Sequence, residues 1–455
     1  MYPNTRLQCS SAGSLLIGLT LFSASTDPVP AQNLSTTNKP AWLTDLSLSV
    51  KESYDDNVFL SGVDPKYLPA SYNVPAGSVA ALENRGSWVT TFSPKLGFDL
   101  APLLGDRQTL KVLSLVYSPD FVIYHDDPTE SYDAHRFATS VKAGLGDFSA
   151  SVDNGFTYIH GSEIGVYYPG ALFSAIGIGA PRERREQIQD RATVNFQYDQ
   201  DKWFVRPTAS LIDYDLMTEL LNVTGYQNYS SRYDLNGGAD FGYKILPQFA
   251  ATVGYRYGHQ YQEQFNFLQY SSPSDYQRVL LGLEGKPWNW LDLKLQGGPD
   301  FRSYADDSAT HITPIGNKHA IVYYGEELLT ATLTDKDTLA FKGKQWQWVS
   351  SIGRVPYFEC CYDLSYRRKL TSKLSLDLGA KLLSCDYTSG NLASCQRDDW
   401  QYTFSGGLGY CFNSHVSASL TYARDMGRNA EDGVVNPQTR EYDRDLISLG
   451  ATVKF

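Results

Sequence analysis

Alternation with a period of two is the feature that most constrains how this chain can fold. Between Tyr233 and Ile245 every second residue is apolar, aromatic or glycine, and the residues between them are polar, charged or glycine. The same division recurs in six further stretches: Trp88–Leu100, Phe137–Leu145, Phe148–Tyr158, Leu291–Phe301, Leu374–Leu382 and Tyr402–Phe412. Segments of about 12 residues exceed the 5 or 6 of an ordinary globular strand, and they suit a tilted strand that crosses a membrane. The pattern predicts an all-β chain whose strands each have one apolar face.

The links between these segments alternate in length. Short links lie at 101–107, 146–147, 199–202, 246–248, 286–289, 334–337, 369–373 and 413–414, and mostly longer ones lie at 61–83, 125–131, 161–185, 218–228, 262–274, 305–316, 351–356, 388–397 and 429–440. Tight turns at one end and long loops at the other are typical of outer-membrane barrels. We therefore predict a transmembrane antiparallel β-barrel of about 18 strands. The hairpin of Lys318–Leu333 and Thr338–Val349 is the weakest, and about 16 strands remain without it.

Composition narrows the class of protein. The chain has 455 residues, a formal net charge of -11, and 13% aromatic residues. A chain so rich in aromatic residues and so modestly charged folds rather than staying disordered. An acidic balance also disfavours nucleic acid as a partner, because phosphates are neutralised by clustered Lys and Arg.

The first residues resemble a secretory signal. An apolar core, Leu15–Phe22, follows Arg6, and Val29-Pro30-Ala31 offers small residues before a cleavage point at Gln32. An uncleaved N-terminal anchor is the alternative. We predict a signal peptide at 1–31, a short periplasmic segment at 32–44 and a single barrel at 45–455.

The last strand predicts how the barrel is recognised during assembly. Residues Ile447–Phe455 alternate and end in an aromatic residue. A terminal Phe of this kind is similar to the signal by which the barrel-assembly machinery of bacteria recognises outer-membrane proteins. We therefore assign Phe455 to assembly and expect outer-membrane lipid and that machinery as partners.

Two stretches carry a family resemblance. Residues Leu46–Leu60, which include Tyr54-Asp55-Asp56-Asn57, resemble the opening strand of the second type of β-barrel porin, a family of bacterial outer-membrane β-barrel proteins. The run from Lys344 to Arg368 is similar to members of the same family. The resemblance implies an outer-membrane barrel, and it supplies no catalytic residue or substrate.

If the apolar register faces lipid, the alternate residues line a pore. The predicted pore-lining residues are Lys51, Lys95, Arg136, Lys142, Arg206, Arg232, Asp234, Asp240, Lys244, Arg256, Lys294 and Arg302. Five more bases (Arg191, Arg278, Lys381, Arg444 and Lys454) and six more acids (Asp99, Asp153, Glu284, Asp292, Asp300 and Asp377) share this face, so fifteen bases oppose eight acids, a balance of about +7. A basic wall favours anions. The alternative is an interior of compensated ion pairs.

Three other features carry predictions. The third outer loop, 161–185, contains the apolar run Ile164–Phe173, which would fold into the lumen, contact a neighbouring barrel or form a surface cap. Cys385 and Cys395 flank one outer loop and could form a disulfide in an oxidising periplasm. Trp88, Trp203, Trp288, Trp290, Trp400 and Tyr442 are expected near the membrane interfaces.

Motifs of enzymes and cofactor sites are missing from the sequence. There is no Gly-x-Ser-x-Gly, no His-Glu-x-x-His and no phosphate-binding loop. We predict a non-enzymatic, cofactor-free, porin-like channel of the bacterial outer membrane for passive diffusion of small solutes, with anions favoured and a homo-oligomer allowed. The alternatives are an accessory or structural barrel in polysaccharide export or surface attachment, and a secreted soluble β-rich binding protein.

Overall fold

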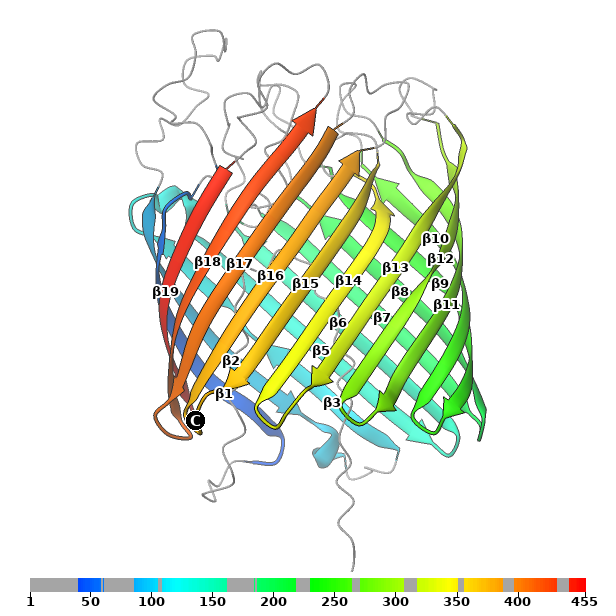
Figure 1. The fold of residues 1–455 in the computed structure, drawn as a ribbon, viewed down its shortest axis with the longest axis horizontal. Coiled ribbons are helices and arrows are strands. Elements are labelled where there is room, and N and C mark those ends of the chain that lie inside the picture. The colour runs from blue at the N-terminus through cyan, green and yellow to red at the C-terminus, as the bar shows by residue number, and fades with distance from the viewer. Residues whose placement is uncertain are drawn as a thin grey trace, which may run out of the picture.

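The computed structural model describes residues 40–58, 60, 86–104, 109–161, 184, 186–217, 230–263, 271–306, 317–350, 356–387, 397–431 and 442–455. They form one sheet of tilted strands that curves round on itself (Figure 1). The strands are β1 Leu43–Asp55, β2 Ser87–Asp99, β3 Leu110–Tyr117, β4 Asp120–Tyr124, β5 Tyr132–Leu145, β6 Phe148–His160, β7 Gln187–Asp199, β8 Trp203–Asp215, β9 Arg232–Leu246, β10 Phe249–Gln262, β11 Ser274–Trp288, β12 Leu291–Tyr304, β13 His319–Thr332, β14 Asp337–Trp348, β15 Tyr357–Lys369, β16 Leu374–Tyr387, β17 Arg397–Cys411, β18 Val416–Glu431 and β19 Tyr442–Lys454. Two short 3-10 helices cover Ala101–Leu103 and Pro128–Glu130.

Pairing of the first strand with the last closes the barrel. β1 pairs antiparallel with β2 on one edge and with β19 on the other, from Ser47↔Lys454 to Asp55↔Leu446. β3 and β4 both lie between β2 and β5, so they share one place in the wall. The wall is therefore an 18-stranded antiparallel closed barrel, and the predicted fold class is confirmed.

The break between β3 and β4 has a local cause. Pro119 separates the two strands, and proline has no N–H to donate to a neighbouring strand. Ser118 still donates its main-chain N–H to the carbonyl of Arg136 at 2.9 Å, so the wall stays continuous. The weakly predicted hairpin is present as β13 and β14, which excludes the count of about 16.

The two ends of the barrel differ in the length of the links that join the strands there. The strand ends that the longer links join lie at one end of the barrel, here called the loop end, whereas the short turns and the C-terminus lie at the other, the turn end (Figure 1). Phe455 closes the last strand there by donating its N–H to the carbonyl of Leu46 at 2.9 Å. In the described part of the chain, no helix is long and apolar enough to cross a membrane.

The two faces of the wall differ in the way that the alternation predicts. On β9 the side chains of Leu235, Phe241 and Tyr243 are about half exposed, whereas Asp234 and Asp240 on the opposite face are buried. Exposed apolar residues thus cover the outside of the barrel, and polar residues fill its inside. Trp88, Trp203, Trp288 and Trp290 are exposed on the outside near strand ends. The prediction is wrong for Tyr442, which is buried at 2% exposure over Gly427 on the inner face.

Candidate functional site

The inner face of the barrel carries the residues that the sequence assigns to a pore. Register with the exposed apolar residues places the following side chains on that face: Lys51, Lys95, Arg136, Lys142, Arg206, Arg232, Asp234, Asp240, Lys244, Arg256, Lys294 and Arg302. Their backbone positions alternate strictly with outward residues such as Val50, Phe137, Leu235 and Val253, which are exposed. That these side chains line an open pore stays a prediction.

Most of these basic side chains are held by carboxylates. Arg206 contacts both Asp240 (3.1 Å) and Glu284 (2.7 Å), and Arg256 contacts Asp240 (2.8 Å). The remaining pairs are Lys95–Asp45, Arg136–Asp120, Lys244–Asp199, Lys294–Glu326 and Arg302–Asp300. The interior is therefore largely compensated, which was the alternative to a basic wall.

The sequence-based charge balance of about +7 is too high. It omits nine acidic residues that register places on the inner face: Asp45, Asp55, Asp120, Asp199, Glu326, Glu359, Asp363, Asp399 and Asp425. Among the described residues it omits fewer bases there, including Lys342, Lys344, Arg367 and Lys369. Several of these residues lie at strand ends, and others lie in β13–β15, where alternation is less regular. Extending each alternating segment by two or three residues would have found most of them.

One stretch of the wall leaves the cylinder at the loop end. β13 and β14 pair from Thr332↔Thr338 only as far as Gly325↔Gln345. β14 nevertheless continues to Trp348, and it stays paired with β15 up to Trp348↔Tyr357. β14 therefore parts from β13 beyond Gln345.

Residues 346–350, here called the inward segment, cross over the inner face of distant strands. Gln347 accepts hydrogen bonds at its carbonyl from Gln260 of β10 (3.1 Å) and Arg302 of β12 (3.2 Å). The carbonyl of Ser350 accepts from Gln262 (2.6 Å). Three strands separate β10 from β14 in the wall, a distance of about 19 Å at about 4.8 Å per strand. Contacts over that distance require the segment to lie inside the barrel.

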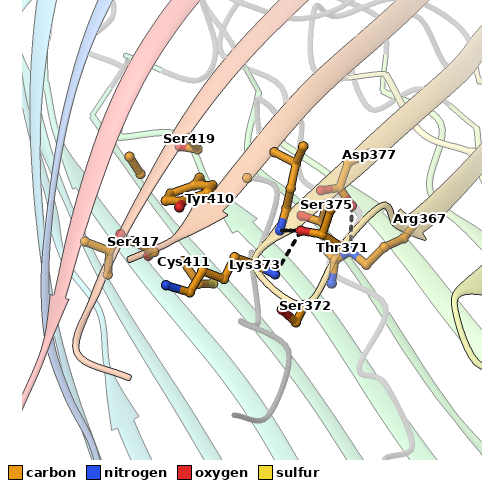
Figure 2. Close-up of a pocket in the computed structure, with 14 residues that line it drawn as sticks. Arg367, Thr371, Ser372, Lys373, Ser375, Asp377, Tyr410, Cys411, Ser417 and Ser419 are labelled. Atoms are coloured by element: carbon orange, nitrogen blue, oxygen red, sulfur yellow. Dashed lines mark hydrogen bonds and ion pairs between the residues drawn. The ribbon is translucent and has the colours of Figure 1, made fainter. Parts of the chain in front are cut away.

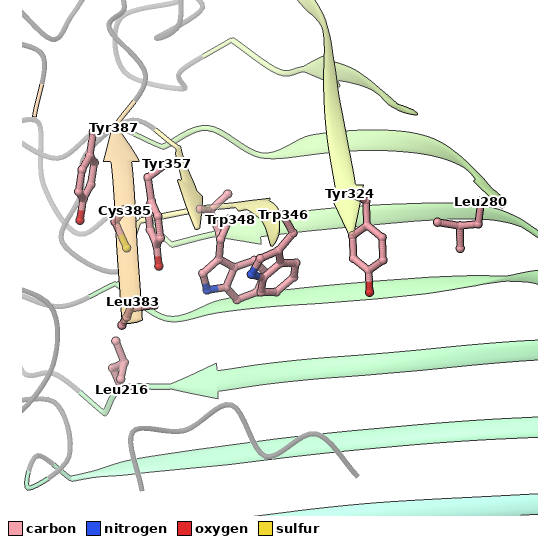
Figure 3. Close-up of a cluster of buried hydrophobic side chains, with 10 residues drawn as sticks. Leu216, Leu280, Tyr324, Trp346, Trp348, Tyr357, Leu383, Cys385 and Tyr387 are labelled. Atoms are coloured by element: carbon pink, nitrogen blue, oxygen red, sulfur yellow. The ribbon is translucent and has the colours of Figure 1, made fainter. Parts of the chain in front are cut away.

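Aromatic side chains form the surface of the inward segment. Trp346 and Trp348 stack with their ring centroids 4.5 Å apart. They belong to a buried cluster with Leu216 at the end of β8 and with Leu383, Tyr387 and neighbouring residues of β15 and β16 (Figure 3). The cluster therefore joins residues from well-separated strands of the barrel. It narrows the lumen near the loop end.

A buried polar network holds the inward segment against β9–β12. Asp300 is 1% exposed and contacts both Arg278 (2.8 Å) and Arg302 (3.1 Å). Asp234 accepts hydrogen bonds from Tyr276 (2.9 Å) and Gln260 (2.8 Å). Hydrogen-bonded networks of this kind rigidify the groups they connect. They fix the carbonyl of Gln347 in place through Gln260 and Arg302.

Cations lie on the aromatic rings of the same region. The guanidinium of Arg232 is 4.9 Å from the ring centroid of Trp348, and the Nζ of Lys344 is 3.5 Å from that of Trp346. Trp346 also donates its Nε1–H to Glu359 at 3.1 Å. A solute that passes this level would meet flat aromatic faces and fixed charges of both signs.

The sequence did not identify the inward segment, and it offered loop 161–185 as one candidate for folding into the lumen. The apolar run Ile164–Phe173 lies outside the described residues, so its predicted position is untested. Arg184, near the end of that loop, is buried and contacts Glu130 at 2.8 Å and the carbonyl of Val58 at 2.6 Å. The alternating Gln and Trp of residues 345–348 could have revealed the inward segment. Side chains that can hydrogen-bond occur on both faces there, whereas a strand in contact with lipid has one apolar face.

At the loop end, burial shifts the pKa of one carboxyl group, that of Asp127. Asp127 precedes the short helix Pro128–Glu130, outside the strands. Burial raises the pKa of its carboxyl, and the neighbouring charges of Glu130 and Asp126 raise it further, while Arg184 opposes them.

A small pocket lies at the turn end between β15 and β18 (Figure 2). Its polar groups already have local partners. Thr371 accepts from the main-chain N–H groups of Lys373 (3.1 Å) and Leu374 (3.0 Å), and Arg367 pairs with Asp377. The pocket reflects the chemistry of a tight turn rather than a binding site.

Metal and disulfide chemistry have little support. Among the described residues no group of three or more His, Cys, Asp or Glu side chains could hold a metal ion. Cys385 is buried on the inner face. Cys395 lies outside the described residues, so the predicted disulfide with Cys385 stays a prediction.

No family model matches this chain, and no curated protein matches it. Membership of the second type of β-barrel porin therefore stays a prediction.

Several solved structures are similar to this chain over most of its length. OpdK from Pseudomonas aeruginosa is 11% identical with a TM-score of 0.41, and the match covers 90% of this chain and 99% of that one. OccAB2 from Acinetobacter baumannii is 12% identical (TM-score 0.37; 90% and 98% covered). The siderophore receptor PirA from the same organism is 8% identical (TM-score 0.39; 91% and 81% covered). At these values the similarities define neither a family nor a substrate for this chain.

Proposed function

We propose that this protein is a channel of the bacterial outer membrane for passive diffusion of small solutes. The observation that carries the proposal is a closed barrel with an apolar outside and a charged inside. Closure leaves no unpaired strand edge at the β1–β19 junction, and the apolar outside suits lipid. A soluble β-rich binding protein would have no use for such an outer surface.

The inward segment sets the size limit of the channel in this proposal. It places Trp346 and Trp348 within the lumen near the loop end, and the polar network of Asp300 and Arg302 prevents it from moving freely. Small solutes pass beside the segment, and larger ones are excluded. A rigid constriction of this kind needs no energy source and no moving domain.

Selectivity for anions is the finer part of the proposal, and we expect it to be weak. Most basic side chains of the inner face are paired, so little net positive charge remains to concentrate anions.

Purified protein in liposomes tests the proposal. Swelling rates with a series of sugars and small organic anions should fall steeply with solute size and should differ little with charge. Folded barrels that admit no solute at all would contradict a diffusion channel.

An accessory or structural barrel is a second candidate function. Ion pairing across the inner face and a buried cluster within the lumen favour it, because a sealed barrel needs a filled interior. Such a barrel would be impermeable in the same liposomes. The swelling experiment therefore separates the two functions directly.

A further inference from the structure

A hollow lies on the outward surface of β10–β13, near the loop end. Its volume is about 580 Å³, within the range of about 300–1,000 Å³ that is typical of small-molecule sites. Register aligns the outward side chains that line it in two rows. The loop-side row contains Asp275, Ser303 and His319, and the turn-side row contains Tyr257, Gln277, Phe301 and Ile321. All of these residues are exposed, so molecules in the surrounding membrane can reach the hollow.

The hollow crosses the edge of the apolar belt of the barrel. His319 lies twelve residues along β13 from Ala331, which pairs with Leu291 beside the exposed Trp290 at the turn end. With about 3.3 Å per residue and a tilt of about 40°, these two levels are about 30 Å apart along the membrane normal. The apolar band of an outer-membrane barrel is about 25 Å tall. The loop-side row therefore lies at the level of lipid headgroups, and the turn-side row lies at the edge of the hydrocarbon.

Hydrogen-bonding groups of both kinds face the hollow. Asp275 engages His259 at 2.8 Å through one carboxylate oxygen, and the other oxygen accepts no bond from a described residue. Ser303 and His319 make no side-chain hydrogen bond to the described part of the chain. The amide of Gln277 is a further donor, because only its Oε1 atom accepts a hydrogen bond, at 3.3 Å. A ligand can therefore both donate to and accept from these side chains.

The charge around the hollow disfavours a phosphate headgroup. Among the described side chains on its outward surface, Asp275 carries the only formal charge, and this charge is negative. Arg302 also borders the hollow, but its guanidinium is buried in the polar network of the inner face. The neighbouring Lys318 is paired with Asp306 at 2.8 Å. Anionic headgroups are attracted by clustered Lys and Arg, whereas a neutral head with several hydroxyl groups matches a mixture of donors and acceptors.

We propose that this hollow binds one glycolipid of the membrane. An acyl chain lies along Phe301 and Ile321, and the hydroxyl groups of the sugar head bond to Asp275, Ser303 and His319. A sugar and an acyl chain joined in one molecule fit a hollow that extends from the headgroup level to the hydrocarbon. The proposal concerns the outside of the barrel and does not depend on the proposed function.

Lipid retention measured by native mass spectrometry tests the proposal. The barrel is folded into phosphatidylcholine vesicles that contain equal small fractions of a dihexosyl diacylglycerol, phosphatidic acid and diacylglycerol, all with the same acyl chains. It is then extracted in a mild detergent that contains no sugar. One dihexosyl diacylglycerol should remain bound per barrel, at least about ten-fold more often than either of the other two lipids. No retained lipid, equal retention of the three, or a preference for phosphatidic acid overturns the proposal.

Two variants separate recognition of the chain from recognition of the head, each compared at equal amounts of folded barrel judged by its gel shift. Ser303→Trp fills the hollow and should abolish retention, whereas Ala239→Trp, exposed on the outside of β9 away from the hollow, should not. Gln277→Leu with His319→Leu keeps the apolar wall but removes two hydrogen-bonding groups, so the preference for the sugar head should be lost. Unchanged retention in Ser303→Trp, or an unchanged preference in the double variant, contradicts the site.

Discussion

The guanidinium of Arg232 donates a hydrogen bond of 2.5 Å to the carbonyl of Val349, although four strands separate β9 from β14 in the wall. The contact is made inside the barrel. It shows that the end of β14, although still paired with β15, turns into the lumen, and it links the inner charges to the narrowing of the lumen.

The two faces of the wall should respond differently to charge. Phe241 and Leu281 are exposed on the outside, so changing either to Arg should cost about 2 to 4 kcal/mol of unfolding free energy near the membrane centre. Urea titration of the barrel folded into lipid bilayers measures this. Asn236→Arg on the inner face is the control, and it should alter conductance at little cost in stability. Labelling of a Cys at position 241 by a water-borne reagent from the lumen would reverse the assignment of faces.

Asp300 should be the least replaceable carboxylate of the polar network. Arg302→Met leaves it buried with Arg278 as its remaining basic contact, and we expect a loss of about 3 kcal/mol. Adding Asp300→Asn should cost less than the sum of the two single changes, because the neutral amide no longer requires both cations. Denaturant unfolding of all three variants gives the coupling. Additive effects would mean that the pair is not energetically connected.

Selectivity should depend on the bases around Asp240. Arg206→Gln with Arg256→Gln leaves Asp240 and Glu284 without these partners, so the reversal potential in a salt gradient should move toward cations. The shift should be largest in dilute salt, since the Debye length is ~30 Å at 0.01 M and ~10 Å at 0.1 M. Arg424→Gln, on the outer surface, is the control. An unmoved potential in the double variant would remove these residues from the ion path.

Phe455 should matter for assembly rather than for stability. Its side chain is exposed at the turn end, so its loss removes little buried surface. Deleting it should nevertheless leave aggregates in the periplasm and little heat-modifiable barrel, if the assembly machinery reads it. Normal amounts of folded barrel in the deletion strain would show that the residue has no such role.

Local periodicity was enough to predict the wall. Each strand can be predicted from the alternation within its own residues, as in Tyr233–Ile245. One face of every strand contacts lipid and the other contacts the polar interior, so apolar and polar residues alternate along it. The break at Pro119 was missed, although proline is a local signal, because the segment still reads as a single strand. The prediction for Tyr442 was wrong because it rested on the residue type alone and not on which face of the strand the residue occupies.

Contacts between distant residues could not be predicted in the same way. The bond from Arg232 to Val349 joins residues 117 positions apart, and no periodic pattern reports it. Ion pairs such as Arg206–Asp240 depend on register between strands, which a sequence fixes only through its turns. The count of basic and acidic residues on the inner face therefore overestimated the positive electrostatic potential that a solute would meet in the lumen.

Single-channel conductance in planar bilayers tests the central claim most directly. The natural chain should give discrete openings, and Trp346→Ala with Trp348→Ala should raise their conductance by roughly a factor of two, because the inward segment loses its bulk. Trp288→Ala, exposed on the outside at the turn end, should leave conductance unchanged. Folded protein that shows no openings, or openings that the two inner Trp residues do not affect, would contradict a channel narrowed by residues 346–350.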